Sequence, residues 1–269
     1  MTYIKEYWDN KEKRARRAVE WTQKMARQHP VAIKKAVENT ITYLENQRFH
    51  EFDTNPDMEI IITDSDSVRA ILNEARKIEE ENSGKRLAVL NFSSFKNPGG
   101  MFEQGSKAQE ECLCHESFLY NVLKEKMDFY EQNRKYTNRA LYLNRALYTP
   151  DVTFGSLDYG VSCDVITCAA PNRSAAQKHC GVTAEENHEV LKSRIKYVLD
   201  IAKEEEVDVL ILGAYGCGVF GQNPSDVAKI FKDYLESDCG CFDRVVFAIP
   251  NGNNKNLSEF CRVFKKKVV

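Results

Sequence analysis

The chain has 269 residues, a length that fits one large domain or one domain with an accessory element. Apolar residues make up 42%, charged residues 29% and the formal net charge is −2 at pH 7, a composition typical of soluble globular proteins that argues against a broad electrostatic grip on nucleic acid. No uncharged apolar stretch reaches the roughly 18 residues of a membrane span. The nine cysteines lack the spacing of a disulfide framework, and the N-terminus does not resemble a secretory signal. We therefore expect a cytoplasmic protein, or a nucleocytoplasmic one in a eukaryote.

Residues 5–48 predict two helices interrupted at His29-Pro30, and we expect a helical accessory element over residues 1–57. From residue 58 to 269, strand-like and helical segments alternate. The strands are predicted at 58–62, 86–92, 163–169, 207–212 and 245–249, and the helices at 67–81, 110–123, 183–205, from 224 and from about 257. Residues 126–160 carry no decisive pattern. The alternation predicts an α/β fold, namely a three-layer α/β/α sandwich with a mixed sheet.

Two helix starts are indicated by specific capping residues. Thr183 and Glu186 have the spacing of a capping box, in which each side chain bonds to the other residue's backbone N–H. Asn223 precedes Pro224, so an N-cap is followed by the residue best suited to the first helical position.

A glycine-rich loop delivers two adjacent carboxylates to a predicted helix start. Gly99 and Gly100 permit positive φ and close approach of another molecule, and they are followed by Gln109, Glu110 and Glu111 at the helix N-terminus. Adjacent helical residues differ by about 100° in azimuth, so we expect the two glutamates to divide the work. The alternative is plain helix capping, for which acidic residues are also favoured.

A second glycine-rich loop runs from residue 213 to 221, between a predicted strand and a helix, where backbone N–H groups can point at phosphate oxygens. We expect it to hold a diphosphate through Gly213, Tyr215, Gly216, Cys217, Gly218, Val219 and Phe220, with Phe220 packing on a sugar or base. Residues 216–221 also match G-x-G-x-x-G, so a Rossmann dinucleotide site competes. Its late position and the missing acidic residue after the next strand count against that reading. A structural turn without a ligand is the remaining alternative.

The first loop resembles the GGG-x(6–8)-QEE signature of poly(ADP-ribose) glycohydrolases, in the microbial-type branch of the macrodomain superfamily. It reads Gly99-Gly100-Met101, seven residues, then Gln109-Glu110-Glu111, so Met101 stands in place of the third glycine. Further segments resemble the same family, in the family's order, at 148–152, 165–172, 213–221 and 244–249.

The resemblance implies a macrodomain-like catalytic domain over residues 58–269 that hydrolyses ribose–ribose O-glycosidic bonds in poly(ADP-ribose) and releases ADP-ribose. It implies that Glu111 is the acid/base residue and that Glu110 positions the ribose, while Asn97, Gly99, Gly100 and Gln109 are further candidate substrate contacts. We expect ADP-ribose and poly(ADP-ribose), free or attached to modified proteins, as partners, with no cofactor, no membrane and no sequence-specific nucleic acid, and a monomeric chain.

Two other functions remain open. The first is an ADP-ribose reader that binds without cleaving; the retained glutamates argue against it, and the bulky Met101 argues mildly for it. The second is a mono(ADP-ribosyl) hydrolase.

One set of cysteine and histidine residues and one basic segment are each interpreted without a ligand. Cys112, Cys114 and His115, and Cys239 with Cys241, lack the spacing of zinc ligands, so we expect no metal site and buried thiols instead. The basic run from Lys11 to Arg17 is expected to form a solvated helix face, with contact to a polyanionic substrate chain as the alternative.

Overall fold

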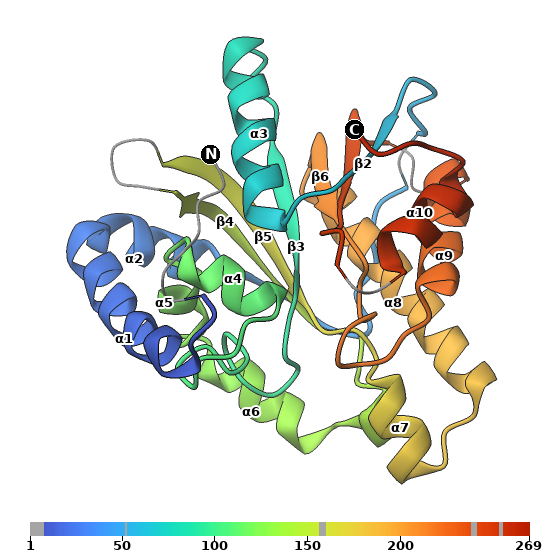
Figure 1. The fold of residues 1–269 in the computed structure, drawn as a ribbon, viewed down its shortest axis with the longest axis horizontal. Helices are drawn as coiled ribbons and strands as arrows, with labels where there is room; N and C mark the ends of the chain where they lie inside the picture. The colour runs from blue at the N-terminus through green and yellow to red at the C-terminus, as the bar shows by residue number, and fades with distance from the viewer. Residues whose placement is uncertain (1–7, 52, 156–159, 238–240, 253–254) are drawn as a thin grey trace.

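The computed structural model describes residues 8–51, 53–155, 160–237, 241–252 and 255–269. In these parts of the chain, strands far apart in sequence form one seven-stranded sheet with the order β1-β4-β5-β3-β6-β7-β2 (Figure 1). The strands are β1 (Ile41–Tyr43), β2 (Glu59–Thr63), β3 (Leu87–Phe92), β4 (Ala146–Phe154), β5 (Val161–Cys168), β6 (Val209–Leu212) and β7 (Arg244–Ala248).

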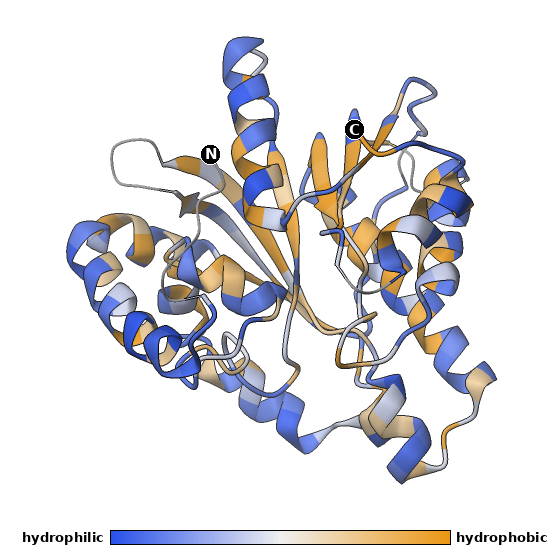
Figure 2. Cartoon of the chain, in the orientation of Figure 1, coloured by the Kyte–Doolittle hydropathy of each residue, from blue (hydrophilic) through white to orange (hydrophobic). Residues whose placement is uncertain are grey.

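Helices cover both faces of this sheet (Figure 1). They are α1 (Lys11–Gln28), α2 (Pro30–Asn39), α3 (Ser67–Glu80), α4 (Gln109–His115), α5 (Leu119–Leu123), α6 (Met127–Lys135), the short 3₁₀ helix η1 (Asn138–Ala140), α7 (Arg173–Cys180), α8 (Ala184–Glu204), α9 (Pro224–Glu236) and α10 (Asn256–Phe264). Side chains of β3 alternate between the two layers, because successive strand residues point to opposite faces. Leu87 and Val89 pack with α1 to α6, whereas Ala88 and Leu90 pack with α8 to α10. Figure 2 shows the apolar strands between helices that turn polar residues outward.

The sheet is mixed, as the sequence predicts. β3 runs parallel to both of its neighbours, β5 and β6, whereas β4 runs antiparallel to β5 and to β1. Since β3 and β6 are adjacent and parallel, their C-terminal ends lie at the same edge of the sheet. The two glycine-rich loops begin at those ends, so the strand order places them side by side.

Most predicted elements are confirmed to within a few residues, including both predicted caps. Glu186 N donates to Thr183 Oγ1 at 3.1 Å and Thr183 N donates to Glu186 Oε2 at 2.8 Å. Asn223 Oδ1 accepts from Ser225 N at 2.9 Å. The undecided segment 126–160 contains α6, η1 and β4, and α7 is a further helix that the sequence pattern did not indicate.

The single helix predicted at 110–123 is wrong, because the chain breaks between α4 and α5. Ser117 forms a β-bridge with Phe154, and Gly155 N donates to Glu116 O at 3.0 Å. The Ser117 hydroxyl donates to Leu113 O at 2.7 Å and closes the end of α4. No glycine or proline marks this break; the contact with β4 produces it.

The N-terminal helices break at His29-Pro30 as predicted, but Ile41 lies in a strand instead of continuing a helix. Its strand β1 pairs with β4 from Ile41 opposite Tyr148 to Tyr43 opposite Ala146. The domain boundary at residue 57 stays a prediction, although one strand of the shared sheet precedes it.

Candidate active site

The loop between β3 and α4, residues 93–108, is called the carboxylate loop below because its backbone lies directly on two carboxylates. Gly99 and Gly100 both have a φ of +63°, in the region that favours glycine. A Cβ on Gly100 would lie 2.6 Å from Oε1 of Glu111 and 2.9 Å from Oε2 of Glu110. The glycine at position 100 is therefore required by the contact as well as by the backbone angle.

Glu111 is 5% exposed, and the carboxylate loop holds both of its carboxyl oxygens. Met101 N donates to Oε1 and Ala108 N donates to Oε2, each at 2.9 Å. The bond from Ala108 is the helix capping that the simpler reading of the sequence expected. The bond from Met101 comes from the middle of the loop and has no capping role, so this side chain ties the middle of the loop to its C-terminal end.

Glu110 is 3% exposed and makes a different set of contacts. Ser94 N donates to its Oε2 at 2.7 Å, and Asn91 Nδ2 donates to its Oε1 at 3.3 Å. Burial raises the pKa of Glu110 to about 8, the nearby charge of Glu111 adds to the rise, and the hydrogen bonds oppose it. Burial therefore favours the protonated form of Glu110, and both carboxyls reach the same small region under Gly100.

Gln109 binds the protein backbone with both ends of its amide. Its Oε1 accepts from Phe92 N at 2.8 Å, and its Nε2 donates to Leu90 O at 2.8 Å and to Ser67 Oγ at 3.1 Å. These bonds anchor the start of α4 to the end of β3 and to α3. They place Gln109 as the anchor of the glutamate pair, and the predicted contact with substrate stays a prediction.

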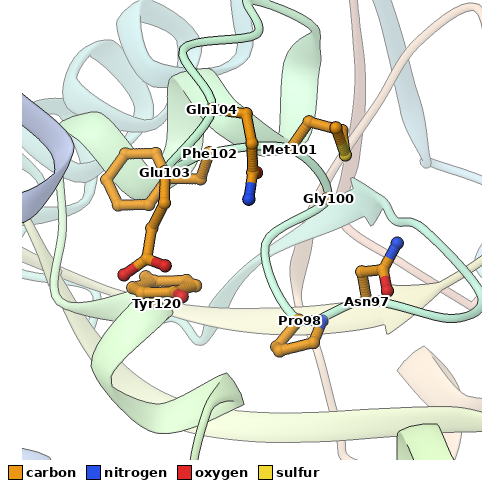
Figure 3. A pocket seen from close by; sticks show the side chains of 8 residues that line it. All are labelled: Asn97, Pro98, Gly100, Met101, Phe102, Glu103, Gln104 and Tyr120. Atoms are coloured by element: carbon orange, nitrogen blue, oxygen red, sulfur yellow. The ribbon is translucent and has the colours of Figure 1, made fainter. Parts of the chain in front are cut away.

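Asn97 lines a surface hollow of about 210 Å³ on the carboxylate loop, together with Pro98, Gly100, Met101, Phe102, Glu103, Gln104 and Tyr120 (Figure 3). Met101 is 47% exposed at this hollow, while its backbone N–H holds Glu111. Figure 3 shows the Glu103 carboxylate beside the Tyr120 ring, and burial together with Glu103 raises the pKa of the Tyr120 phenol. Gly99 packs on the same ring, because a Cβ there would lie 2.6 Å from Tyr120 Cδ2.

The second loop, residues 213–221, presents a run of backbone donors. Among the described residues, no hydrogen-bond acceptor faces the N–H groups of Gly218, Val219 or Phe220, whereas Gly221 N donates back to Gly218 O at 3.0 Å. Val219 is 85% exposed, and a Cβ on Gly218 would meet nothing within 4 Å. Three consecutive donors beside open space suit an anionic group.

Other residues of this loop have structural surroundings. Gly213 packs against Ala248 O, and Gly216 has a φ of +73° with its Cα against Ala170. Tyr215 is fully buried, and its hydroxyl donates to Cys168 O at 3.0 Å. Cys217 is partly buried, and burial raises the pKa of its thiol to about 12. The Tyr215 ring therefore supports the loop from inside, and a substrate contact by this side chain stays a prediction.

Phe220 connects the two loops through an aromatic cluster. Phe95, from the carboxylate loop, stacks on Tyr142 with ring centroids 4.3 Å apart, and Tyr142 lies 6.0 Å from the ring of Phe220. Phe220 is only partly buried there. The cluster joins the two loops at one edge of the sheet and leaves part of one ring accessible.

Sequence reasoning missed three residues of this site. Asn91 is fully buried in β3, and it is the polar residue inside the apolar run 87–92, which was an available signal. Ser94 holds Glu110 through its backbone N–H, which any residue type except proline can supply, and its hydroxyl oxygen accepts from Asn97 N at 3.1 Å. Tyr142 lies in the segment without a decisive pattern, so nothing in the sequence indicated it. Asn172, the last residue of the segment 165–172 that resembles the family, caps α7 by accepting from Ala175 N at 3.0 Å.

Among the described residues, no group of three or more His, Cys, Asp or Glu side chains could hold a metal ion. Cys239 lies outside the described residues, and Cys114 is a buried thiol. Within the same ranges, no helix combines the length and the apolar character needed to cross a membrane.

Comparison with known proteins identifies relatives of this arrangement. The family model for the catalytic domain of microbial-type poly(ADP-ribose) glycohydrolase matches residues 12–155. The structure of poly(ADP-ribose) glycohydrolase from Thermomonospora curvata is 28% identical with a TM-score of 0.82, over 94% of this chain and 100% of that chain. A second structure from that organism, bound to the inhibitor ADP-HPD, is 28% identical with a TM-score of 0.79, over 93% and 99% of the two chains.

The poly(ADP-ribose) glycohydrolase from Deinococcus radiodurans, in complex with ADP-ribose, is 31% identical with a TM-score of 0.75, over 87% of this chain and 97% of that chain. None of the curated protein sequences matches this chain significantly.

Proposed function

Because the chain belongs to the microbial-type poly(ADP-ribose) glycohydrolase family, we propose that it hydrolyses ribose–ribose O-glycosidic bonds in poly(ADP-ribose) and releases ADP-ribose. The observation that carries the proposal is the buried pair Glu110 and Glu111 beneath the backbone of Gly100. Glycosidic hydrolysis commonly uses a pair of carboxyl groups and passes through an oxocarbenium-like transition state.

The second loop would hold the diphosphate of the substrate. The three consecutive N–H groups of residues 218–220 complement phosphate oxygens, and the open space at Gly218 allows close approach to the backbone. Phe220 would offer its accessible part to the adjoining sugar or base. The similar Deinococcus radiodurans enzyme was solved with ADP-ribose, which supports this ligand class. Binding energy from these remote contacts would orient the scissile bond over the carboxyls.

Glu111 is assigned as the acid/base residue that protonates the leaving 2′-oxygen and then, as a carboxylate, activates water. Glu110 is assigned to the hydroxyls of the bound ribose, and its raised pKa favours the protonated form, which can donate a hydrogen bond to a hydroxyl. A diphosphate in the second loop would favour the protonated form of its neighbours and so promote the acid role of Glu111.

A purely binding reader is the second candidate, and the exposed Met101 side chain is the observation that favours it. A bulky group at this point of the carboxylate loop would obstruct a chain that continues past the terminal ADP-ribose. A mono(ADP-ribosyl) hydrolase is equally compatible with a site restricted to one terminal unit. The macrodomain-like fold, the monomeric state and the cytoplasmic location expected from the sequence also remain proposals.

One assay separates these functions. Purified protein is incubated with automodified poly(ADP-ribose), and free ADP-ribose is measured by chromatography beside the Glu111→Gln variant. Release by the wild-type chain and not by the variant supports the glycohydrolase. Tight binding of ADP-ribose without release by either protein would establish the reader instead. Cleavage of a mono(ADP-ribosyl)ated substrate alone would establish the third function.

A further inference from the structure

Helix α1 lies directly against the carboxylate loop, 91 positions further along the chain. Gly105 of the loop has a φ of +75°, and a Cβ there would lie 2.1 Å from Lys11 O and 3.0 Å from Ala15 N. The backbone of the loop therefore touches the backbone of the helix. This contact leaves no room for any side chain at position 105.

Arg14 bonds the two segments together, which corrects the expectation that the whole run from Lys11 to Arg17 is solvated. Its side chain is buried, with 7% exposed, and its Nε donates to Gly105 O at 2.7 Å. Its guanidinium also donates to Trp8 O. A buried cation is retained only where its donors find partners, and here a carbonyl of the carboxylate loop is one of them.

Gly105 lies between the two residues that hold Glu111. Met101 N and Ala108 N donate to the Glu111 carboxylate, and turn bonds connect Gly105 to the first of them. Gly105 N donates to Phe102 O at 3.0 Å, and Ser106 N donates to Met101 O at 3.1 Å. A displacement of the Gly105 peptide would therefore move the donors that orient Glu111.

We propose that Arg14 is a positioning residue for Glu111, and that α1 acts through it as a brace on the carboxylate loop. The effect on turnover rests on the proposed function, whereas the effect on the loop does not. The helix has other anchors, because Trp21 Nε1 donates to Ser117 O at 2.8 Å and Asn121 Nδ2 donates to Thr22 O at 3.0 Å. Loss of Arg14 should therefore loosen the loop without detaching the helix.

The test compares Arg14→Ala with the matched control Arg16→Ala, an exposed arginine of the same helix. We expect Arg14→Ala to lower kcat by roughly 10-fold or more, within the range for a misplaced catalytic group, and to change KM much less. Faster hydrogen exchange is expected at the amides of Met101 and Ala108, and added guanidinium should restore part of the activity. Arg16→Ala should match the wild type in all three measurements.

Wild-type kcat and unchanged exchange at both amides in a folded Arg14→Ala protein would overturn the proposal. If that variant does not fold, Arg14→Lys decides in its place, because an ammonium group lacks the planar fork that reaches both carbonyls. Faster amide exchange in the variant, with no hydrolysis by the wild-type chain, would support the brace and reject the proposed function. The two failures are therefore distinguishable.

Discussion

Asn91 Nδ2 lies 3.3 Å from Oε1 of Glu110, so a strand residue in the middle of the sheet holds one carboxyl of the site. The same Nδ2 also lies 3.3 Å from Thr167 Oγ1 on the neighbouring strand β5. A hydrogen bond donated to a carboxylate stabilises its charged form, and this one lowers the pKa of Glu110 against the effect of burial. Asn91 thereby influences the pH range in which Glu110 carries a proton.

Replacing Asn91 with leucine should raise the pKa of Glu110 further, because the donor is lost while burial remains. The basic limb of the pH profile of kcat/KM should then shift to higher pH than in the wild-type chain. Asn97→Leu, at an exposed position of the carboxylate loop, is the control and should leave the position of that limb unchanged. A limb that stays in place in a folded Asn91→Leu protein would show that this amide does not affect the titration.

The wild-type profile itself should fall above pH 8 or so in kcat/KM, since Glu110 loses the proton with which it would bind the ribose hydroxyls as the pH rises through its raised pKa, about 8. In kcat the limb should lie higher, because a bound diphosphate favours protonated carboxyls. Steady-state kinetics at several pH values would measure both limbs, with chemistry shown to be rate-limiting. Coincident limbs would remove the contribution of the substrate and leave the glycohydrolase assignment intact.

Glu111→Gln should reduce kcat by at least about 10², the scale of general acid catalysis, while ADP-ribose affinity stays within a few-fold. The substitution also leaves one loop donor facing an amide NH₂ group, because glutamine has a single acceptor where the carboxylate has two. Thermal unfolding should show a loss of roughly 1–3 kcal/mol for that unsatisfied donor. Undiminished turnover, measured as released ADP-ribose, would refute the acid/base assignment. Glu110→Gln should impair turnover too, through the position of the ribose.

Stability should depend on the protonation of Glu110. Its folded pKa is raised from 4.5 to about 8, so between those values the unfolded chain releases a proton that the folded chain keeps. The free energy of unfolding should therefore fall as the pH rises through this window, by at most about 1.4 kcal/mol per pH unit, and level off above it. Urea denaturation across the window should show this slope as the difference between the wild type and Glu110→Gln. Parallel curves would contradict the raised pKa.

Two glycines of the second loop should respond differently to substitution. Gly218→Val should abolish ADP-ribose binding in calorimetry and leave the melting temperature nearly unchanged, because a Cβ at this position meets nothing within 4 Å. Gly221→Val should destabilise the fold, since Gly221 has a φ of +69° and a Cβ there would lie 2.1 Å from Ser174 Oγ. Intact affinity in a folded Gly218→Val protein would exclude the backbone of this loop as the diphosphate site.

The sequence by itself determined the parts of this protein that depend on neighbouring residues. Helix starts such as the Thr183–Glu186 capping box, the alternation that predicts a mixed sheet, and the delivery of Glu110 and Glu111 to a helix start are local in origin. The family followed from the same local motifs, because each is a short run with a definite spacing. Local patterns also led to a wrong prediction at Ser117, where a bridge to β4 ends the helix that the sequence predicted to continue to residue 123.

Only the tertiary structure decided which local pieces meet. The order of β3 and β6 in the sheet brings the two loops to one edge, and the burial that raises the pKa of Glu110 comes from layers packed around it. The same packing turns Arg14 inward onto Gly105 and places Tyr215 in the core. Judged from the sequence near each of them, the side chains of Arg14 and Tyr215 would be expected at the surface. Burial and long-range contacts are properties of the assembled sheet and its helices. The two residues of such a contact lie far apart in the sequence, so no short segment contains both of them.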